Sequence, residues 1–266
     1  WFIGHLLSYT SSKSREGNIY SLVMLLVLAG SFISWPVIRG NASSANYDAI
    51  TWLGGLVLFT ETAMPAGSQK NRIIGEWLIW PVFLITVRIM YFPLLLLSLF
   101  SLVWLLRRKN FSLLFWGLTA TILVTAPFFI RNVILSGYLF YPVVSPDIFN
   151  LDWKADPDEA GSIIHFIKYF NRVSTGFLPL EQTAAMDFPN WILAWFKYMF
   201  LYSKIIFIPG IIGLLMLPFS IKKNPLFSGH LARLIGPVLL LQILVWFIFA
   251  PDPRFIYGCL LVGWIV

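Results

Sequence analysis

The chain of 266 residues is 58% hydrophobic, 17% aromatic and only 12% charged, with a mean hydropathy of +0.78. This composition excludes an ordinary soluble domain and predicts a membrane protein. The net charge of +7 does not indicate nucleic acid as a partner, because the basic residues fall in short clusters between apolar runs, as in the loops of membrane proteins.

The apolar runs predict an all-α, polytopic transmembrane helix bundle that forms a single domain over residues 1–266, with seven complete spans. The first two spans, 19–37 and 49–66, are flanked by basic clusters that we expect on the cytoplasmic side. The polar loop between these spans, which ends at Asp48, is therefore expected on the outside.

The next apolar run, residues 77–106, is too long for one span. As a single helix it would extend ~45 Å, which exceeds the ~30 Å hydrocarbon core. Basic residues flank the run on both sides, so an even number of crossings is favoured. We expect a hairpin of two short spans that breaks near Arg88 to Pro93, where a charge and a proline coincide; the alternative is one steeply tilted, kinked helix.

Residues 111–130 predict a span that leads outward, and residues 131–190 then form a large extracytoplasmic loop. This segment carries seven acids and four bases, a net charge of −3, which fits an outer position. Asp156 followed by a proline is a strong helix start. Apolar residues at helical spacing follow up to a stop at Gly176, which predicts an amphipathic helix on the membrane surface or on the bundle.

The aromatic stretch at residues 191–203 predicts a surface-lying segment, followed by a span over residues 205–220. Residues 235–250 return to the outside, where the sequence Pro-Asp-Pro-Arg-Phe at 251–255 predicts a rigid, charged turn. The last apolar run is too short to span, and the chain begins on Trp1, so we interpret the sequence as a fragment of a longer protein that lacks its N-terminal part.

Several charged and polar groups are predicted to converge on the outer side, and this convergence is the main functional signal. An arginine there can meet phosphate or carboxylate with a rigid fork of donors. The alternatives are an interfacial anchor for Arg131, a snorkelling side chain for Arg88, and ordinary turn or loop chemistry for the others. The candidates are Asp48, Arg88, the pair Arg131 and Asn132, the triplet Asp152, Trp153 and Lys154, and Asp252 with Arg254.

No cofactor is predicted, because no His, Cys or acidic residues recur at the spacing of metal ligands. Dependence on a divalent metal is left open. The motifs that remain are PFFIRNVILSGYLFYP at 127–142, the Asp-Pro-Arg-Phe turn at 252–255, and the acidic residue that opens a span in Asn46-Tyr47-Asp48. With Asp152-Trp153-Lys154, they resemble features of GT-C-like membrane glycosyltransferases and are similar to a poorly characterised bacterial family of polytopic proteins.

The resemblance implies transfer of a sugar from a polyprenyl-phosphate carrier to a saccharide or lipid acceptor on the extracytoplasmic face of the bacterial cytoplasmic membrane. It assigns the carrier's phosphate to Arg131, Arg88 and Arg254. Asn132 would orient a group by a hydrogen bond, Asp48 and Asp252 would position an arginine or a sugar hydroxyl, and Trp153 would stack on a sugar. The catalytic acid of such enzymes usually lies in the first outer loop, which we expect upstream of this fragment, so no catalytic residue is named.

Other classes of membrane protein remain open. A polysaccharide polymerase, ligase or flippase would share the aromatic spans and the outer arginines. A secondary transporter would show paired broken helices in two halves, and the sequence predicts one break, at Arg88 to Pro93. A non-catalytic membrane subunit would need no convergence of charges. Membrane lipids are the expected surroundings in each case.

Overall fold

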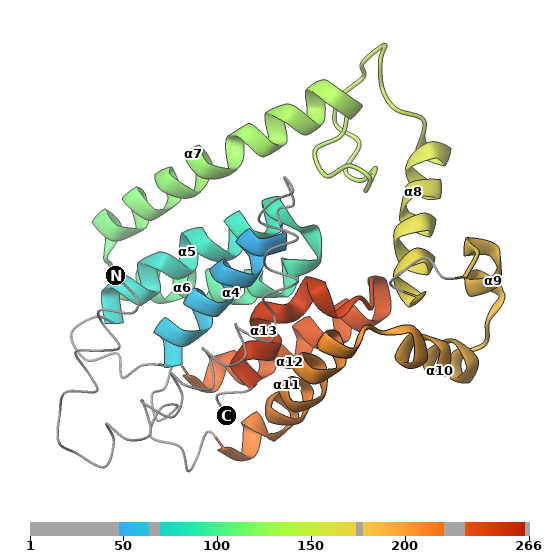
Figure 1. The fold of residues 1–266 in the computed structure, drawn as a ribbon. Helices are drawn as coiled ribbons and strands as arrows, with labels where there is room; N and C mark the ends of the chain where they lie inside the picture. Colours follow the sequence, from blue (N-terminus) through green and yellow to red (C-terminus); the bar gives the residue numbers. More distant parts are fainter. Residues whose placement is uncertain (1–47, 64–69, 174–177, 221–231, 264–266) are drawn as a thin grey trace.

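The computed structural model describes residues 48–63, 70–173, 178–220 and 232–263, which are helical apart from turns, irregular loops and one isolated β-bridge. The expected span at 19–37 lies outside these residues. Figure 1 shows a bundle with three further helices, α8 to α10, at one of its ends. The bundle contains α4 (Asp48–Ala63), α5 (Lys70–Val87), α6 (Leu95–Arg107), α7 (Phe111–Ser136), α11 (Leu201–Ser220), α12 (Ala232–Phe249) and α13 (Tyr257–Gly263). The three outer helices are α8 (Pro157–Phe170), α9 (Leu180–Ala185) and α10 (Phe188–Tyr198).

The break expected within residues 77–106 is confirmed. Helix α5 ends before Arg88, which is extended, and the 3-10 helix η2 (Ile89–Leu94) leads into α6. The hydroxyl of Ser98 donates to the backbone oxygen of Trp77 at 2.7 Å, and the hydroxyl of Ser101 donates to that of Ile74. The partner moves backward along α5 as the donor moves forward along α6. The two helices therefore form an antiparallel hairpin and not one kinked helix.

The first arm of the hairpin is longer than expected. We predicted a basic loop around Lys70 and Arg72, but α5 begins at Lys70. The Nε atom of Arg72 lies 3.3 Å from Oε1 of Glu76, an i,i+4 ion pair of the kind that forms along one face of a helix. The two arms, α5 and the continuous stretch Ile89–Arg107, contain 18 and 19 residues, so each approaches the ~20 residues of a full span.

Helix α7 continues six residues beyond the expected end at Ile130, so that prediction was wrong. The side chain of Asn110 caps its start by accepting the amide of Leu113, and the stop is Gly137, whose φ of +78° suits a glycine. No glycine or proline interrupts residues 131–136, and this explains why the helix does not stop earlier. The first residues of the segment expected as a loop at 131–190 are therefore helical.

The predicted start of the amphipathic helix is confirmed at α8. The Asp156 side chain accepts the amide of Asp158 at 3.0 Å, with Pro157 in the first helical position. The helix ends at Phe170 and is followed by the short 3-10 helix η3 (Asn171–Val173). The predicted stop at Gly176 lies outside the described residues.

Helix directions bring the ends of several segments together. Leu113 of α7 lies against Gly75 of α5, and the hydroxyl of Thr121 donates to the backbone oxygen of Leu78 at 3.1 Å. The two helices thus run in the same direction, and Arg88 and the C-terminal part of α7 lie toward the same end. Figure 1 shows the outer helices α8 to α10 beyond this end of the bundle.

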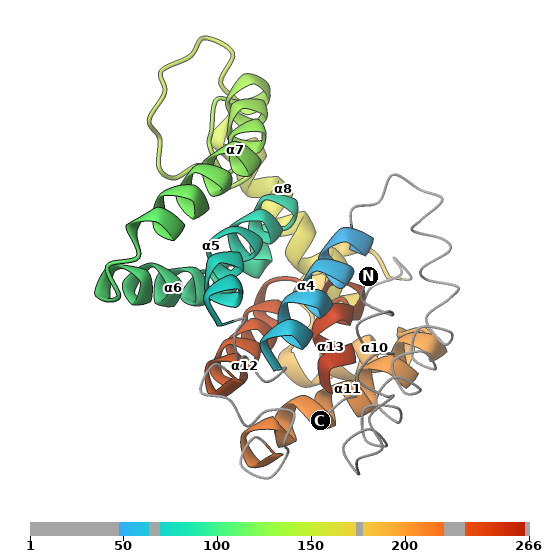
Figure 2. The same ribbon diagram turned by 90° about the vertical axis from the view of Figure 1, so that its left-hand side faces the viewer.

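The starts of α4, α11 and α13 meet at this end as well. The rings of Trp52 and Tyr257 lie 5.2 Å apart, and the Tyr257 hydroxyl is 2.8 Å from that of Ser203. Helix α12 ends in the turn that precedes α13, and η5 (Pro253–Ile256) forms part of this turn. Figure 2, at right angles to Figure 1, shows α4, α12 and α13 next to one another, with α7 on the other side of α5 and α6.

Two helical stretches among the described residues are long and apolar enough to cross a membrane, Ile89–Arg107 and Phe111–Ser136. A third is counted if α10 and α11 are taken together as one span, although their axes differ by 118° at the break between them. Three apolar helices of 10–17 residues accompany them. The bend confirms a break between two helices in this region, but α11 begins at Leu201, within the stretch 191–203 that was predicted to precede it.

Candidate functional site

The first residue of α4 and the residue at the hairpin break form a buried ion pair. The Nε atom of Arg88 donates to Oδ1 of Asp48 at 2.6 Å, and a second guanidinium nitrogen contacts the same oxygen. Only 1% of the Asp48 side chain and 19% of the Arg88 side chain are exposed. The guanidinium carbon also lies 3.8 Å from the centre of the Phe255 ring. Arg88 therefore connects α4, the hairpin and the turn before α13.

A second acid and arginine form a pair within that turn. The Nε atom of Arg254 is 2.9 Å from Oδ2 of Asp252, although its N–H direction does not meet the geometry of a hydrogen bond. The backbone amide of Arg254 donates to Oδ1 of Asp252 at 3.0 Å. The Asp252 side chain is 7% exposed and the Arg254 side chain 38%. Arg254 is thus fixed at its base and accessible at its tip.

The two pairs are within electrostatic reach of each other. Burial raises the pKa of the Asp252 carboxyl to about 6, against the opposing effect of the Arg254 charge and amide. The carboxylate of Asp48 raises this pKa further and the guanidinium of Arg88 lowers it. The predicted convergence of charges therefore holds for these four residues, which come from three separate parts of the chain.

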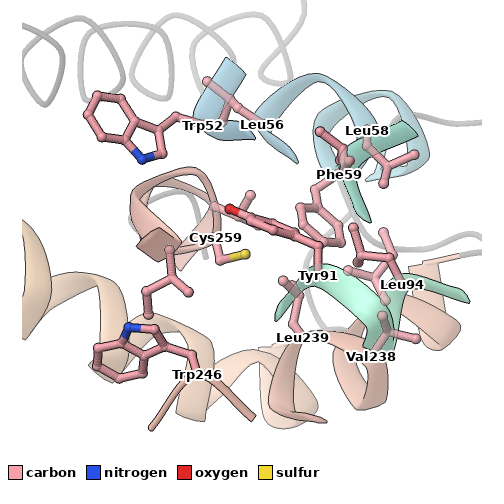
Figure 3. Packing of buried hydrophobic residues seen from close by; sticks show 14 of the residues in the cluster. Trp52, Leu56, Leu58, Phe59, Tyr91, Leu94, Val238, Leu239, Trp246 and Cys259 are labelled. Carbon is pink, nitrogen blue, oxygen red and sulfur yellow. The ribbon is translucent and has the colours of Figure 1, made fainter. Parts of the chain in front are cut away.

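The backbone of the turn at 251–255 is held by aromatic side chains. Four donors from four different helices each reach one of its carbonyl oxygens. Figure 3 labels Trp52, Tyr91 and Trp246 among them, with the indole nitrogens of the two tryptophans turned toward each other. The donors and the residues whose oxygens accept are Trp195 to Pro251, Trp246 to Asp252 at 2.7 Å, Trp52 to Arg254, and Tyr91 to Phe255 at 2.8 Å.

The hairpin break is held in a similar way. Gln242 of α12 is fully buried, and its amide nitrogen donates to the backbone oxygen of Met90 at 3.0 Å. A break in a helix leaves backbone groups that need new partners, above all in apolar surroundings. Gln242 supplies one of them. The backbone at the hairpin break and the backbone of the turn are thus both irregular and both hydrogen-bonded to side chains.

The residue Arg131 lies apart from the four converging charges. Its side chain is exposed on α7, and no described residue forms a hydrogen bond or ion pair with it. Asn132 faces the other way, is buried, and donates to the backbone oxygen of Leu139 at 2.9 Å. In the described structure Asn132 therefore holds the chain as it leaves α7, whereas Arg131 is accessible.

The triplet at 152–154 belongs to the neighbourhood of α7. Lys154 forms an ion pair with Asp147, donates to the oxygen of Phe149 at 2.8 Å and lies 4.8 Å from the ring centre of Tyr138. Asp152 is exposed, and 60% of Trp153 is exposed. The triplet packs near the end of α7, and none of its contacts reaches the four converging charges among the described residues.

The residues that support the site were not predicted from the sequence. Two of them, Ser203 and Tyr257, are hydrogen-bonded to each other beside the turn, and the charge of Asp252 reaches Tyr257. The available signal was the occurrence of Trp and Tyr, which carry one polar donor each, in apolar runs near a turn with several carbonyls. The supporting side chains are Trp52, Tyr91, Trp195, Ser203, Gln242, Trp246 and Tyr257.

Within the described part of the chain, no group of three His, Cys, Asp or Glu side chains could hold a metal ion. Residues 1–261 match a family model with the description "Domain of unknown function (DUF8201)". No curated protein and no solved structure matches the chain.

Proposed function

This chain belongs to the DUF8201 family, and we propose that it is a membrane-embedded, GT-C-like glycosyltransferase that binds the phosphate of a polyprenyl-phosphate-linked sugar. The observation that carries the proposal is the convergence of Asp48, Arg88, Asp252 and Arg254 at one end of an apolar helix bundle. A charge-assisted contact from arginine to phosphate is strong where water is scarce, and it also stabilises the phosphate as a leaving group.

Arg254 is the phosphate ligand with the best support. Its tip is accessible, its amide donates to the Asp252 carboxylate and its carbonyl accepts from Trp52, so its backbone is held on both sides. Arg88 is more deeply buried and contributes positive charge behind it. Both arginines keep an acidic partner, so the empty site does not hold an uncompensated charge.

Asp252 is the residue of this cluster best suited to accept a proton. A carboxyl with a pKa near 6 is mostly ionised at neutral pH and is still basic enough to take the proton of an acceptor hydroxyl. In the proposed step the acceptor oxygen bonds to the sugar, the bond from the sugar to phosphate breaks, and the hydroxyl proton passes to Asp252. Trp153, near the end of α7 and apart from the four converging charges, offers an exposed surface on which a sugar could stack.

The proposed location is the bacterial cytoplasmic membrane, with a multi-pass bundle and residues 131–190 on the extracytoplasmic side. Helix directions that gather the charged residues at the end bearing α8 to α10 support this orientation. The basic residues Arg107, Arg108 and Lys109, which are exposed between α6 and α7, would then lie at the cytoplasmic end.

The test is consumption of a polyprenyl-phosphate-linked sugar by the full-length protein in a bilayer. We expect Arg254→Gln to abolish it, and Arg254→Lys to retain only part because lysine lacks the fork. Arg107→Gln, at the other end of the bundle, is the matched control and should leave consumption unchanged. Full activity of Arg254→Gln would remove the phosphate assignment.

Two further measurements test the extent of the phosphate site and separate a glycosyltransferase from a flippase or transporter. Loss of consumption in Arg131→Ala would extend the phosphate site to α7, whereas an unchanged rate would limit it to the four converging residues. Movement of the intact lipid-linked sugar across the bilayer, without its consumption, would support a flippase or transporter in place of a glycosyltransferase.

A further inference from the structure

The junction between α10 and α11 exposes an apolar face. Within α10, Trp191 and Trp195 are one turn apart and are buried against the bundle, where both rings contact Phe247. The side chains that point away from the bundle are 43–73% exposed. They are Leu193, Phe196, Phe200 and Leu201. Helix α10 is therefore apolar on two sides, and only one of them is covered by described residues.

Two lysines accompany this exposed face. The ammonium group of Lys204 donates to the backbone oxygen of Lys197 at 3.4 Å and lies 5.1 Å from the ring centre of Phe196. The ammonium group of Lys197 lies 5.4 Å from the ring centre of Tyr198. No acidic side chain among the described residues forms an ion pair with either lysine. Two neighbouring positive charges thus remain without a counterion from the described chain.

The geometry of the junction fits the boundary of a bilayer. Helix α11 has 20 residues, a length of ~30 Å that equals the thickness of the hydrocarbon core. Its first turn would then lie at the boundary between acyl chains and headgroups. Because α10 departs from α11 at a bend of 118°, it runs along that boundary instead of across it. Interfacial helices combine an apolar face with lysines and aromatic residues in this way.

We propose that the α10–α11 junction, residues 188–204, is a binding site for an anionic phospholipid of the surrounding bilayer. Lys197 and Lys204 contact the headgroup phosphate and its negative charge. The exposed apolar side chains, including Leu193 and Phe196, insert between the upper parts of the acyl chains. This binding needs no sugar transfer and is independent of the glycosyltransferase proposal.

The test places a fluorescent reporter next to the lysines in the full chain. Leu193→Cys, labelled with bimane, is one helical turn from Lys197, and the native Cys259 is fully buried and protected from the label. The labelled protein is reconstituted into phosphatidylcholine vesicles that contain a small, equal fraction of brominated phosphatidylglycerol or brominated phosphatidylcholine. Bromine quenches the label only at short range, so the ratio of the two quenching efficiencies reports the local preference for the anionic lipid.

We expect phosphatidylglycerol to be enriched about fivefold or more at the label, the factor that one lysine near an anionic surface supplies. The variant Lys197→Gln/Lys204→Gln should lose this preference while quenching by phosphatidylcholine persists, which shows that α10 still lies at the bilayer. Arg107→Gln/Lys109→Gln removes the same charge at the other end of the bundle and should keep the preference. Equal quenching by both lipids in the parent protein, or a preference that survives in the double lysine variant, would overturn the proposal.

Discussion

The buried pair of Asp48 and Arg88 makes a quantitative prediction for stability. Arg88→Met removes the guanidinium and leaves the Asp48 carboxylate, only 1% exposed, without the charge that faces it. Removal of one partner from a buried ion pair costs about 3–5 kcal/mol, because the remaining charge stays buried. We expect the free energy of unfolding of Arg88→Met to fall by this amount.

The assay is reversible unfolding in mixed micelles, followed by helical circular dichroism. Arg72→Met in α5 is the matched control, since Arg72 and Glu76 are paired but 39% and 29% exposed, and such pairs contribute about 0.5 kcal/mol or less. Asp48→Asn added to Arg88→Met removes the buried charge and should restore part of the loss. The reasoning is refuted if Arg88→Met costs no more than Arg72→Met, or if the added Asp48→Asn lowers stability further.

Three further predictions concern the bundle and the turn. Gly213→Ala should prevent tight packing of α11 on α13, because the added Cβ would overlap a backbone oxygen of α13. The control is Gly161→Ala in α8, whose added Cβ meets nothing within 4 Å. In thermal melts this control should be neutral or stabilising by up to about 1 kcal/mol. Burial raises the pKa of Asp252 from 3.8 to about 6, so the folded state binds this proton more tightly than the unfolded chain does. The stability that the bound proton contributes should therefore be lost as the pH rises from 4 to 6. In melts at a series of pH values, Asp252→Asn should remove this dependence on pH. Trp246→Phe removes one of the two donors to the carbonyl of Asp252, which keeps the amide of Phe255. It should cost about 0.5–1.5 kcal/mol beyond Trp80→Phe, a change at a ring that is 37% exposed, in the same unfolding assay.

The hairpin and the bend before α11 could be predicted because each follows from local quantities. Apolar length and flanking charge excluded a single helix over 77–106, and the coincidence of Arg88 with Pro93 marked the break. Residues 191–220 were likewise too long for one crossing and carried aromatic residues and lysines at one end. Neither prediction required knowledge of which helices pack together.

The limits of the prediction have a physical cause too. The end of α7 was placed at Ile130 because the charge of Arg131 was taken as the boundary, yet a helix stops where its backbone must change conformation, at Gly137. The partners of the turn were missed for another reason. Trp52 and Arg254 are hydrogen-bonded across 202 positions of sequence, and Tyr91 and Phe255 across 164, so only tertiary packing brings donor and acceptor together.

The same long-range bonds explain why a charged site can lie in such apolar surroundings. The extended backbone at Arg88 and the turn at 251–255 are both irregular, and irregular backbone in an apolar environment is stable only when its polar groups find partners inside the protein. Gln242 and the four aromatic donors supply those partners without adding charge. The two arginines are therefore attached to backbone whose hydrogen bonds are already made. A phosphate that binds there need not order this backbone, so less of the free energy of its contacts is lost to ordering the protein.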